Sequence, residues 1–274
     1  MGSKKIVGVL VLLGVFCTAL FAGGTKEGGA AGKTLLEQIK AKGELSMGTA
    51  SGYPPYEFVD ITSPTQEVVG VDVALGQRIA DALGVKLKVS DMTFGALLSS
   101  LPAKKIDVAI AGINPTDERK KTVDFSDTYL TAEQRLMIRK SDAGTLTKLE
   151  DFYGKKVAAE KSSTQEALAQ EEIRDVQLIA LERVPDCVLE LLSNKIDGIV
   201  VEDTVAQQYI LSNSELTFSD AVFVNKNKFS AIALEKGNED LLAVINKVIA
   251  DSIADGSIDR WVTEYSLKVL ENSR

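Results

Sequence analysis

The feature that most constrains this chain is a regular alternation of short β-rich runs with segments of helical period. Strand patterns at residues 44–48, 85–89 and 106–110 are separated by helical patterns at 71–83 and 94–101. The 71–83 segment repeats its apolar residues one helical turn apart and is followed by Gly84, which is typical of a helix end. This alternation predicts an α/β fold with mostly parallel sheets flanked by helices.

A second copy of the same unit predicts two lobes. The segment KKIDVAI at 104–110 is echoed by NKIDGIV at 194–200, and further strands at 155–159 and 176–180 alternate with helices at 163–172 and 182–192. We expect a discontinuous first lobe, residues 33–132 and 228–274, and a second lobe, residues 133–227. Crossings at 133–140 and 223–234 would join them, and two crossings imply a hinge and a cleft.

The first residues have the order of a secretory signal. Lys4 and Lys5 precede an apolar run at 6–22, after which residues 23–32 form a glycine-rich flexible tether. We therefore expect a signal peptide at 1–22 and a periplasmic or other extracytoplasmic location. Cleavage before Cys17, with lipid on that cysteine, is the alternative to soluble export, and the run is also near the length of a retained membrane anchor.

Composition narrows the chemistry. The chain has 31 Lys plus Arg against 39 Asp plus Glu, a formal charge of −8, so it offers no broad basic field for nucleic acid. It has no histidine, which excludes His-based catalysis and metal sites, and only two cysteines. We predict no catalytic residue, no metal and no cofactor. Cys187 lies among helically spaced apolar residues and is predicted to be a buried core thiol.

Candidate ligand contacts follow the carboxyl ends of the predicted strands, where open α/β sheets bind ligands. Gly112, Asn114 and Arg119 follow one strand, and a helix begins at Ser163 and Thr164 after another. Asp203 follows a third. Taken singly, Arg119 can be a surface charge, Ser163 an ordinary helix cap and Asp203 the cap of the next helix.

Taken together, these residues place a cation on one lobe and an anion on the other. Such an arrangement suits a zwitterion, with its carboxylate on Arg119 and its ammonium on Asp203. Tyr53, presented by a Pro-Pro turn, and Phe94 are candidate aromatic walls. Each of these aromatic residues taken alone is more often a core residue.

The ordered motifs resemble the polar amino-acid-binding proteins of ABC importers, solute-binding protein family three. The resemblance runs from about residue 43 to 267. Its residues are Gly48-Thr49, Tyr53-Pro54-Pro55-Tyr56-Glu57-Phe58, the segment 69–75, Phe94-Gly95-Ala96-Leu97-Leu98, Lys105-Ile106-Asp107, Ala111-Gly112-Ile113, the segment 116–121, Asp124-Phe125-Ser126, the segment 154–158 and Lys195-Ile196-Asp197-Gly198.

The resemblance implies a two-lobed periplasmic-binding-protein-like fold that closes on a free L-amino acid and delivers it to an ABC permease, as a monomer. It implies that Arg119 holds the α-carboxylate, helped by Gly112, Asn114, Ser163 and Thr164, and that Asp203 holds the ammonium. Tyr53 and Phe94 match the aromatics, and Lys161 and Gln165 match variable pocket positions.

Four positions depart from the family pattern. Ala50 replaces an Asp that is frequent in binders of basic amino acids and of glutamine, which disfavours Lys, Arg, His and Gln as ligands. Lys161, which is not one of these departures, favours a neutral polar or acidic ligand. Val71, Thr128 and Leu130 are structural departures.

Two other functions stay open at this point. The family includes exported cyclohexadienyl or arogenate dehydratases, in which Glu202 or Lys161 would have to act as the general acid. An amino-acid sensor that signals through a membrane protein is the other.

Overall fold

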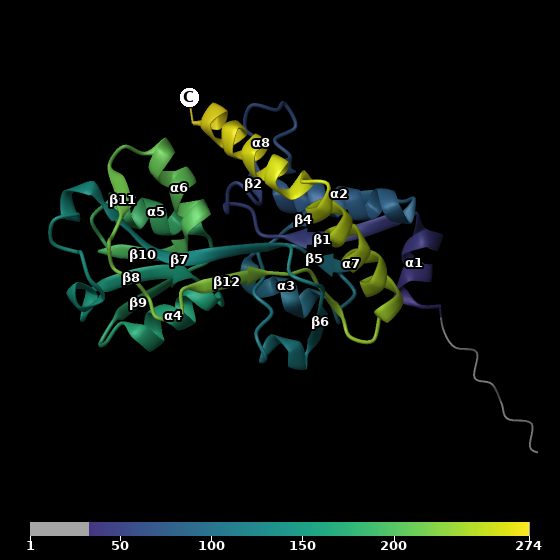
Figure 1. Cartoon of the computed structure of the whole chain (residues 1–274), viewed down its shortest axis with the longest axis horizontal. Helices are drawn as coiled ribbons and strands as arrows, with labels where there is room; N and C mark the ends of the chain where they lie inside the picture. The colour runs from purple at the N-terminus through teal and green to yellow at the C-terminus, as the bar shows by residue number, and fades with distance from the viewer. Residues whose placement is uncertain (1–32, 274) are drawn as a thin grey trace, which may run out of the picture. The chain divides into compact units, whose positions relative to one another are not determined.

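Two sheets organise residues 33–273, the part of the chain that this computed structural model describes (Figure 1). The expected signal peptide, tether and Cys17 lie outside the described residues. The first sheet has the order β4 (Lys86–Asp91), β1 (Glu44–Thr49), β5 (Val108–Ala109), β13 (Ala233–Glu235) and β6 (Val123–Phe125). The second has the order β11 (Leu216–Phe218), β7 (Leu130–Arg139), β10 (Gly198–Glu202), β8 (Lys156–Glu160) and β9 (Gln177–Leu181), and β12 (Asn227–Ser230) also pairs with β7. A separate pair is formed by β2 (Phe58–Val59) and β3 (Val68–Val69).

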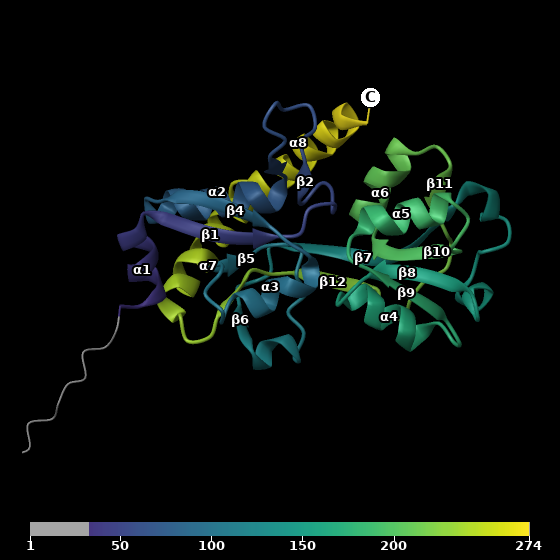
Figure 2. The ribbon, with the colours of Figure 1, turned by 180° about the vertical axis from the view of Figure 1, so that it is seen from behind.

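Helices cover these sheets. The first lobe carries α1 (Leu35–Lys42), α2 (Val71–Leu83), α3 (Phe94–Ser100) and α7 (Glu239–Ala254), and the second carries α4 (Thr164–Glu172), α5 (Val184–Leu192) and α6 (Asp203–Ser212). Figures 1 and 2 show α4 on one side of the second sheet and α5 and α6 on the other. The last helix, α8 (Ser257–Asn272), packs against α2, α7 and α6, so it contacts both lobes.

The alternation of side chains along a strand explains this layering. In β7, Leu136 and Ile138 pack with α4, whereas Met137 between them packs with α5 and α6. In β10, Val200 faces the α4 side and its neighbours Ile199 and Val201 face the other. Because both faces of these strands are buried, their sequences are continuously apolar.

The internal repeat has the same structural role in each lobe. Asp107 accepts a hydrogen bond from the Ser46 amide through Oδ2 at 2.8 Å, and Asp197 accepts one from the Lys156 amide through Oδ2 at 2.9 Å. Each aspartate thus ties the start of one strand to its parallel neighbour. The turns before them use Lys104 and Asn194, both at positive φ.

Both sheets are mixed, whereas the sequence pattern predicts mostly parallel ones. The pairs β1–β4, β1–β5, β8–β10 and β8–β9 are parallel, but β7 runs antiparallel to β10, β11 and β12, and β13 runs antiparallel to β5 and β6. The difference arises at the crossings, because β7 leaves the first lobe and the β12–β13 segment returns to it. The two crossing strands pair with each other, with Leu130 opposite Ser230 and Glu133 opposite Asn227.

Cys187 is fully buried and free, in an apolar cluster that joins α5 and α6 to Tyr53 and Tyr56 of the first lobe. Burial raises the pKa of its thiol to about 12. None of the helices within residues 33–273 combines the length and apolar character needed to cross a bilayer. Over the same residues, no group of three or more potential ligand side chains could hold a metal ion.

Candidate functional site

A small cavity of about 10 Å³ lies where the two lobes meet. Its walls come from the carboxyl ends of β1, β5 and β8, from the first turns of α3 and α4, and from the crossing strand β12. This is the region where an α/β sheet presents loops and free backbone amides to a ligand. The lining residues are Tyr53, Phe94, Ala111, Gly112, Asn114, Arg119, Glu160, Ser163, Thr164, Gln165 and Lys228.

Arg119 supplies an uncompensated positive charge to this cavity. Its guanidinium donates to the Asn114 carbonyl at 2.9 Å and, across the lobes, to the Ser162 carbonyl at 2.9 Å, and it stacks over Phe94 with 5.3 Å to the ring centroid. No carboxylate within residues 33–273 pairs with it, and burial lowers its pKa to about 10. The remaining N–H groups are suited to bind a carboxylate.

The second lobe contributes the N-terminus of α4. The Ser163 hydroxyl caps it by accepting from the Glu166 amide at 3.1 Å, so the amides of Thr164 and Gln165 have no acceptor within the helix. The Gln165 side chain is buried and donates to the Tyr53 hydroxyl at 2.9 Å, across the lobes. This end of α4 can bind an anion.

Lys228, which lines the cavity, forms a buried ion pair with Glu202. Lys228 is 3% exposed and Glu202 is 0% exposed. The Lys228 ammonium donates to the Glu202 carboxylate and, at 2.7 Å, to the Gly112 carbonyl, and it lies 5.5 Å from the centroid of the Tyr53 ring. The positive φ of Gly112 presents that carbonyl, and a Cβ there would lie 3.3 Å from the ammonium.

Two further buried carboxyl groups lie next to each other: Asp72, which contacts Gly112, and Glu57, which neighbours Asp72. Asp72 accepts from the Gly112 amide at 2.8 Å and from the Tyr129 hydroxyl at 2.8 Å, and burial raises its pKa to about 6. Burial and the neighbouring Asp72 raise the pKa of Glu57 well above its usual range. The site is therefore rich in buried acids, and Lys228 is the cation that faces them.

The structure brings eight of the ten predicted site residues to the cavity wall and leaves Lys161 and Asp203 away from it. Lys161 is exposed and pairs with Glu182 at 2.9 Å, because β8 ends at Glu160 and turns Lys161 outward. Asp203 is the first residue of α6, where its carboxylate accepts from the Thr204 amide at 2.7 Å and the Glu133 amide at 3.4 Å. Its predecessor Glu202 ends β10 and faces inward instead.

Sequence reasoning missed three lining residues: Ala111, Glu160 and Lys228. Ala111 and Glu160 each directly follow a predicted strand, as the other candidate contacts do, so the same reasoning could have included them. Lys228 could not be found in this way. A strand that turns its apolar side chains inward would bury Phe229 of β12, but the structure buries Lys228 and Ser230 and leaves Phe229 exposed.

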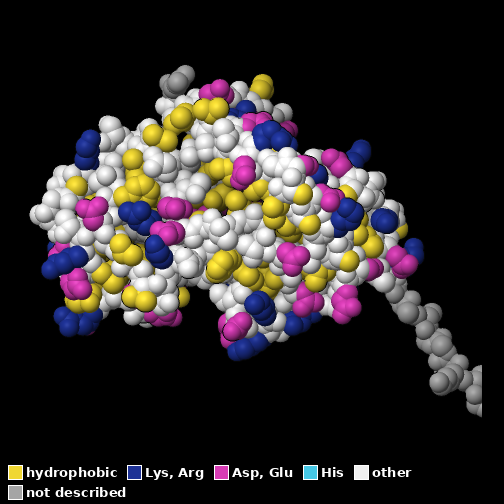
Figure 3. All heavy atoms as spheres, viewed as in Figure 1, with side chains coloured by type: hydrophobic (Ala, Val, Ile, Leu, Met, Phe, Trp, Pro, Cys, Tyr) yellow, Lys and Arg dark blue, Asp and Glu magenta, His cyan; other side chains and the backbone are white. Residues whose placement is uncertain are grey.

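Arg183 joins the lobes through side-chain contacts with residues that do not line the cavity. It donates to the Asp91 carboxylate at 3.1 and 3.2 Å, to the Ser51 carbonyl at 2.7 Å and to the Ser51 hydroxyl at 2.9 Å. Tyr209 adds a hydrogen bond from its hydroxyl to the Gly52 carbonyl at 2.7 Å. On the face drawn in Figure 3, basic and acidic side chains are interspersed, so that face offers no single-signed field.

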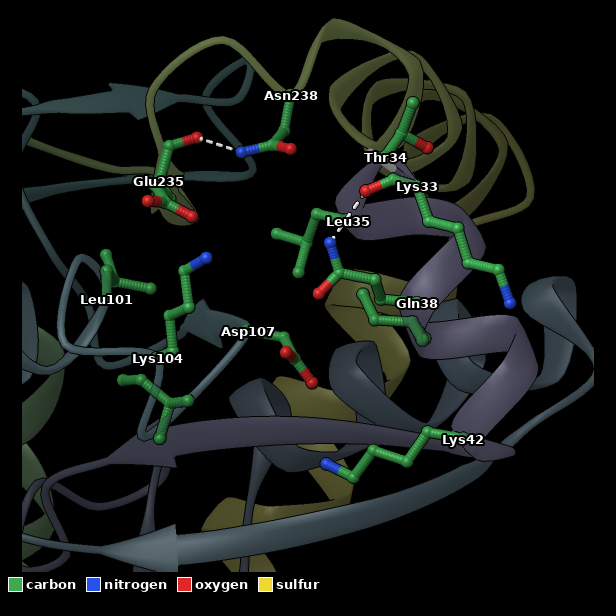
Figure 4. Close-up of a pocket in the computed structure, with 12 residues that line it drawn as sticks. Lys33, Thr34, Leu35, Gln38, Lys42, Leu101, Lys104, Asp107, Glu235 and Asn238 are labelled. Atoms are coloured by element: carbon green, nitrogen blue, oxygen red, sulfur yellow. Dashed lines mark hydrogen bonds between the residues drawn. The ribbon is translucent and has the colours of Figure 1, made fainter. Parts of the chain in front are cut away.

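A larger depression lies beside α1 (Figure 4). It is lined by residues of α1 together with Lys104, Asp107, Glu235 and Asn238. Two of its polar groups already bond within the protein: Asp107 accepts from the Ser46 amide, and Asn238 donates to the Glu235 carbonyl at 2.8 Å. It adjoins the amino end of β1, opposite the strand ends that position ligands, so the interlobe cavity is the better candidate.

Comparison with known proteins agrees with this architecture. Residues 45–268 match the family model of bacterial extracellular solute-binding proteins, family 3. The chain belongs to this family.

Individual relatives and solved structures support the assignment. The chain is 31% identical over 260 residues to the L-cystine-binding protein TcyJ of Escherichia coli, covering 93% of this chain and 96% of that protein. It is 34% identical over 231 residues to the arginine-binding extracellular protein ArtP of Bacillus subtilis, covering 81% and 87%. The crystal structure of the substrate-binding protein AbpA of Streptococcus pneumoniae bound to L-arginine superposes with a TM-score of 0.83 at 32% identity, covering 85% and 98%. The family membership and the two-lobed fold implied by the sequence motifs are thus confirmed.

Proposed function

We propose that this solute-binding protein captures a free L-amino acid between its lobes, outside the cytoplasmic membrane, and presents it to an ABC permease. Family membership, relatives named for cystine and arginine, and a cavity bounded by both lobes support the proposal. The chain would act by binding alone, as a monomer.

The observation that carries this proposal is the unpaired guanidinium of Arg119. It is held against Phe94, it has no carboxylate partner within residues 33–273, and it lies next to the open N-terminus of α4. An α-carboxylate would satisfy the remaining donors of Arg119 and the first amides of α4 together. Asn114 and Ser163 hold these two groups in place, and Tyr53 and Phe94 supply aromatic walls.

Calorimetry on an Arg119→Ala variant tests the carboxylate assignment. A ligand selected by thermal shift from the twenty amino acids and L-cystine should bind roughly 30-fold to several thousand-fold more weakly, because a buried carboxylate loses its cation. Arg174→Ala is a matched control, since that arginine also stacks on an aromatic ring, Tyr153, but lies outside the cavity. A loss smaller than threefold in Arg119→Ala would remove Arg119 from the site.

The ligand class needs a different argument from the one based on sequence. A neutral polar or acidic amino acid is expected from Lys161, but Lys161 faces solvent and pairs with Glu182. The cavity itself must therefore define the class. The thermal-shift panel gives the answer directly, because a ligand that binds only the folded form raises its melting temperature.

Dehydration is a second candidate function, and one observation favours it. Glu160 lines the cavity, and burial raises the pKa of its carboxyl to about 8, which suits a general acid. It would replace Lys161, which is remote, and Glu202, which is ion-paired. Incubation with prephenate and arogenate decides the matter, and absence of product removes this candidate.

The route of export is proposed from the sequence of residues 1–32. Cleavage after residue 22 and lipid attachment at Cys17 leave mature chains of different mass. Mass spectrometry of the protein purified from its membrane and soluble fractions separates the two.

A further inference from the structure

The charges that line the cavity define what its ligand must carry, given the proposed function. Three lining residues are charged: Arg119, Glu160 and Lys228. Arg119 has no carboxylate partner within residues 33–273 and can bind the carboxylate of a ligand. The question is where the positive group of an amino acid would bind.

The inward-facing acid at the end of β10 is already occupied. Glu202 is fully buried, and its charge is neutralised by the Lys228 ammonium, which contacts Oε2, whereas Oε1 has no hydrogen-bond partner within residues 33–273. Lys228 is also held by the Gly112 carbonyl at 2.7 Å. A ligand ammonium at Glu202 would either displace the buried Lys228 or place a second cation on a carboxylate that Lys228 already neutralises.

Glu160 is the remaining acid, and it has no partner of its own. Its side chain is 8% exposed and lines the cavity, yet within residues 33–273 no donor hydrogen-bonds its carboxylate and no cation lies within ion-pair distance. A buried carboxylate in this condition is costly, and a cationic ligand group would relieve the cost. The ionisable groups that influence Glu160 or are influenced by it come from several elements: Tyr53, Glu57, Glu182, Arg183, Cys187, Tyr209 and Lys228.

Glu160 and Arg119 are also linked through the turn that follows Glu160. The guanidinium of Arg119 donates to the Ser162 carbonyl, two residues beyond Glu160, and the Ser163 hydroxyl donates to the Glu160 carbonyl. A molecule that carries a carboxylate and a cation can therefore contact both side chains from one position. A cationic ligand group would favour the ionised form of Glu160, whereas a second carboxylate on the ligand would disfavour it.

We propose that Glu160 binds the cationic group of the ligand while Lys228 keeps Glu202 occupied. The ligand class is then an amino acid with a neutral or basic side chain. This assignment rests on the proposed function and adds a specificity-determining residue to it. The cation is either the α-ammonium or a basic side-chain group, and the test separates these two sources.

The experiment compares wild type, Glu160→Gln and a control, Glu190→Gln, by calorimetry. Gln preserves the shape of the side chain and removes its charge, and Glu190 pairs with Lys195 outside the cavity. The probes are the L-amino acid with the largest thermal shift and its deaminated acid. For L-arginine and L-cystine these acids are 5-guanidinopentanoate and 3,3′-dithiodipropionate, and L-citrulline replaces the guanidinium of arginine by a neutral group.

If Glu160 binds the α-ammonium, Glu160→Gln weakens the amino acid about 10- to 150-fold and leaves the deaminated acid unchanged. If it binds a side-chain guanidinium, L-arginine and 5-guanidinopentanoate both weaken and L-citrulline does not. Equal losses for every probe, or losses below threefold for every probe, overturn the assignment. Failure of wild type to bind any amino acid overturns the proposed function instead.

Discussion

At the scale of single residues, the site contains several buried charged groups, some of which have partners within the protein and some of which do not. Lys228 neutralises Glu202, although Glu202 Oε1 has no hydrogen-bond partner within residues 33–273, and Asp72 is held by an amide and a hydroxyl. The Glu160 carboxyl has no hydrogen-bond or ion-pair partner within residues 33–273, and burial raises its pKa to about 8. Its protonation state is therefore linked to the stability of the fold.

The first prediction concerns the pH dependence of stability in ligand-free protein. The pKa of Glu160 is raised from 4.5 in the unfolded chain to about 8 in the folded one. A carboxyl with a raised folded-state pKa contributes stability below the unfolded pKa and loses that contribution as the pH rises toward 8. Glu160→Gln should therefore gain melting temperature relative to wild type between pH 5 and pH 8. A difference between the two proteins that does not change with pH would contradict this expectation, and Glu190→Gln should show none.

The residue scale also shows how far sequence reasoning reaches. The expectation that ligand contacts follow the carboxyl ends of strands identifies Gly112, Asn114, Arg119 and the start of α4 from the sequence alone. It cannot decide between Glu202 and Asp203, because a shift of one residue at the end of a strand turns a side chain to the opposite face. It also cannot find Lys228, since a lysine on a crossing strand reads as a solvated charge until its buried partner is known.

At the scale of elements, helix starts connect stability to the site. Ser163 and Thr34 cap α4 and α1 in the same way, each accepting from the amide three residues onward. Of these two helices, α4 alone lines the interlobe cavity, with its first turn. The two caps are therefore a matched pair for separating a structural role from a role in ligand binding.

We expect Ser163→Ala and Thr34→Ala each to lower the free energy of unfolding by about 0.5–2 kcal/mol, the usual value of an N-cap. Denaturant titration measures this loss. Ser163→Ala should also weaken amino-acid binding, because the amides of Thr164 and Gln165 lose their fixed direction, whereas Thr34→Ala should not. Equal affinities in the two variants would show that the α4 terminus takes no part in binding.

Elements with a strong period were predictable, and those without one were not. The apolar stripe at 71–83 coincides with α2, and Gly84 ends it at a φ of 71°. The strands β3, β6 and β11 have only two or three residues, too few to show an alternation. The antiparallel strands could not be foreseen either, because their direction depends on where the chain crosses between lobes.

At the scale of the whole molecule, the lobes are joined by contacts that need not involve the ligand. Arg183 bridges from the second lobe to Asp91 and Ser51 in the first, and both charged side chains are about 30% exposed. A contact of this kind favours the form in which the lobes meet. Ligand affinity then depends on it indirectly, because the ligand binds to that form.

Arg183→Ala should weaken amino-acid binding about 2- to 10-fold, as expected for a partly exposed bidentate pair. Small-angle scattering of the ligand-free variant should give a larger radius of gyration than wild type. The matched control is Lys161→Ala, which breaks the exposed pair with Glu182 inside the second lobe. Unchanged affinity and radius in Arg183→Ala would mean that this bridge does not influence lobe closure.

The hydrogen bonds that cross the cavity have a consequence for kinetics. Gln165 bonds to Tyr53, and Arg119 bonds to the Ser162 carbonyl, so the walls on either side of the ligand are tied to each other. A bound molecule can leave only after these bonds have broken and the lobes have separated. Its residence time is then governed by the opening rate of the protein, and under the proposed function a permease would speed release by separating the lobes.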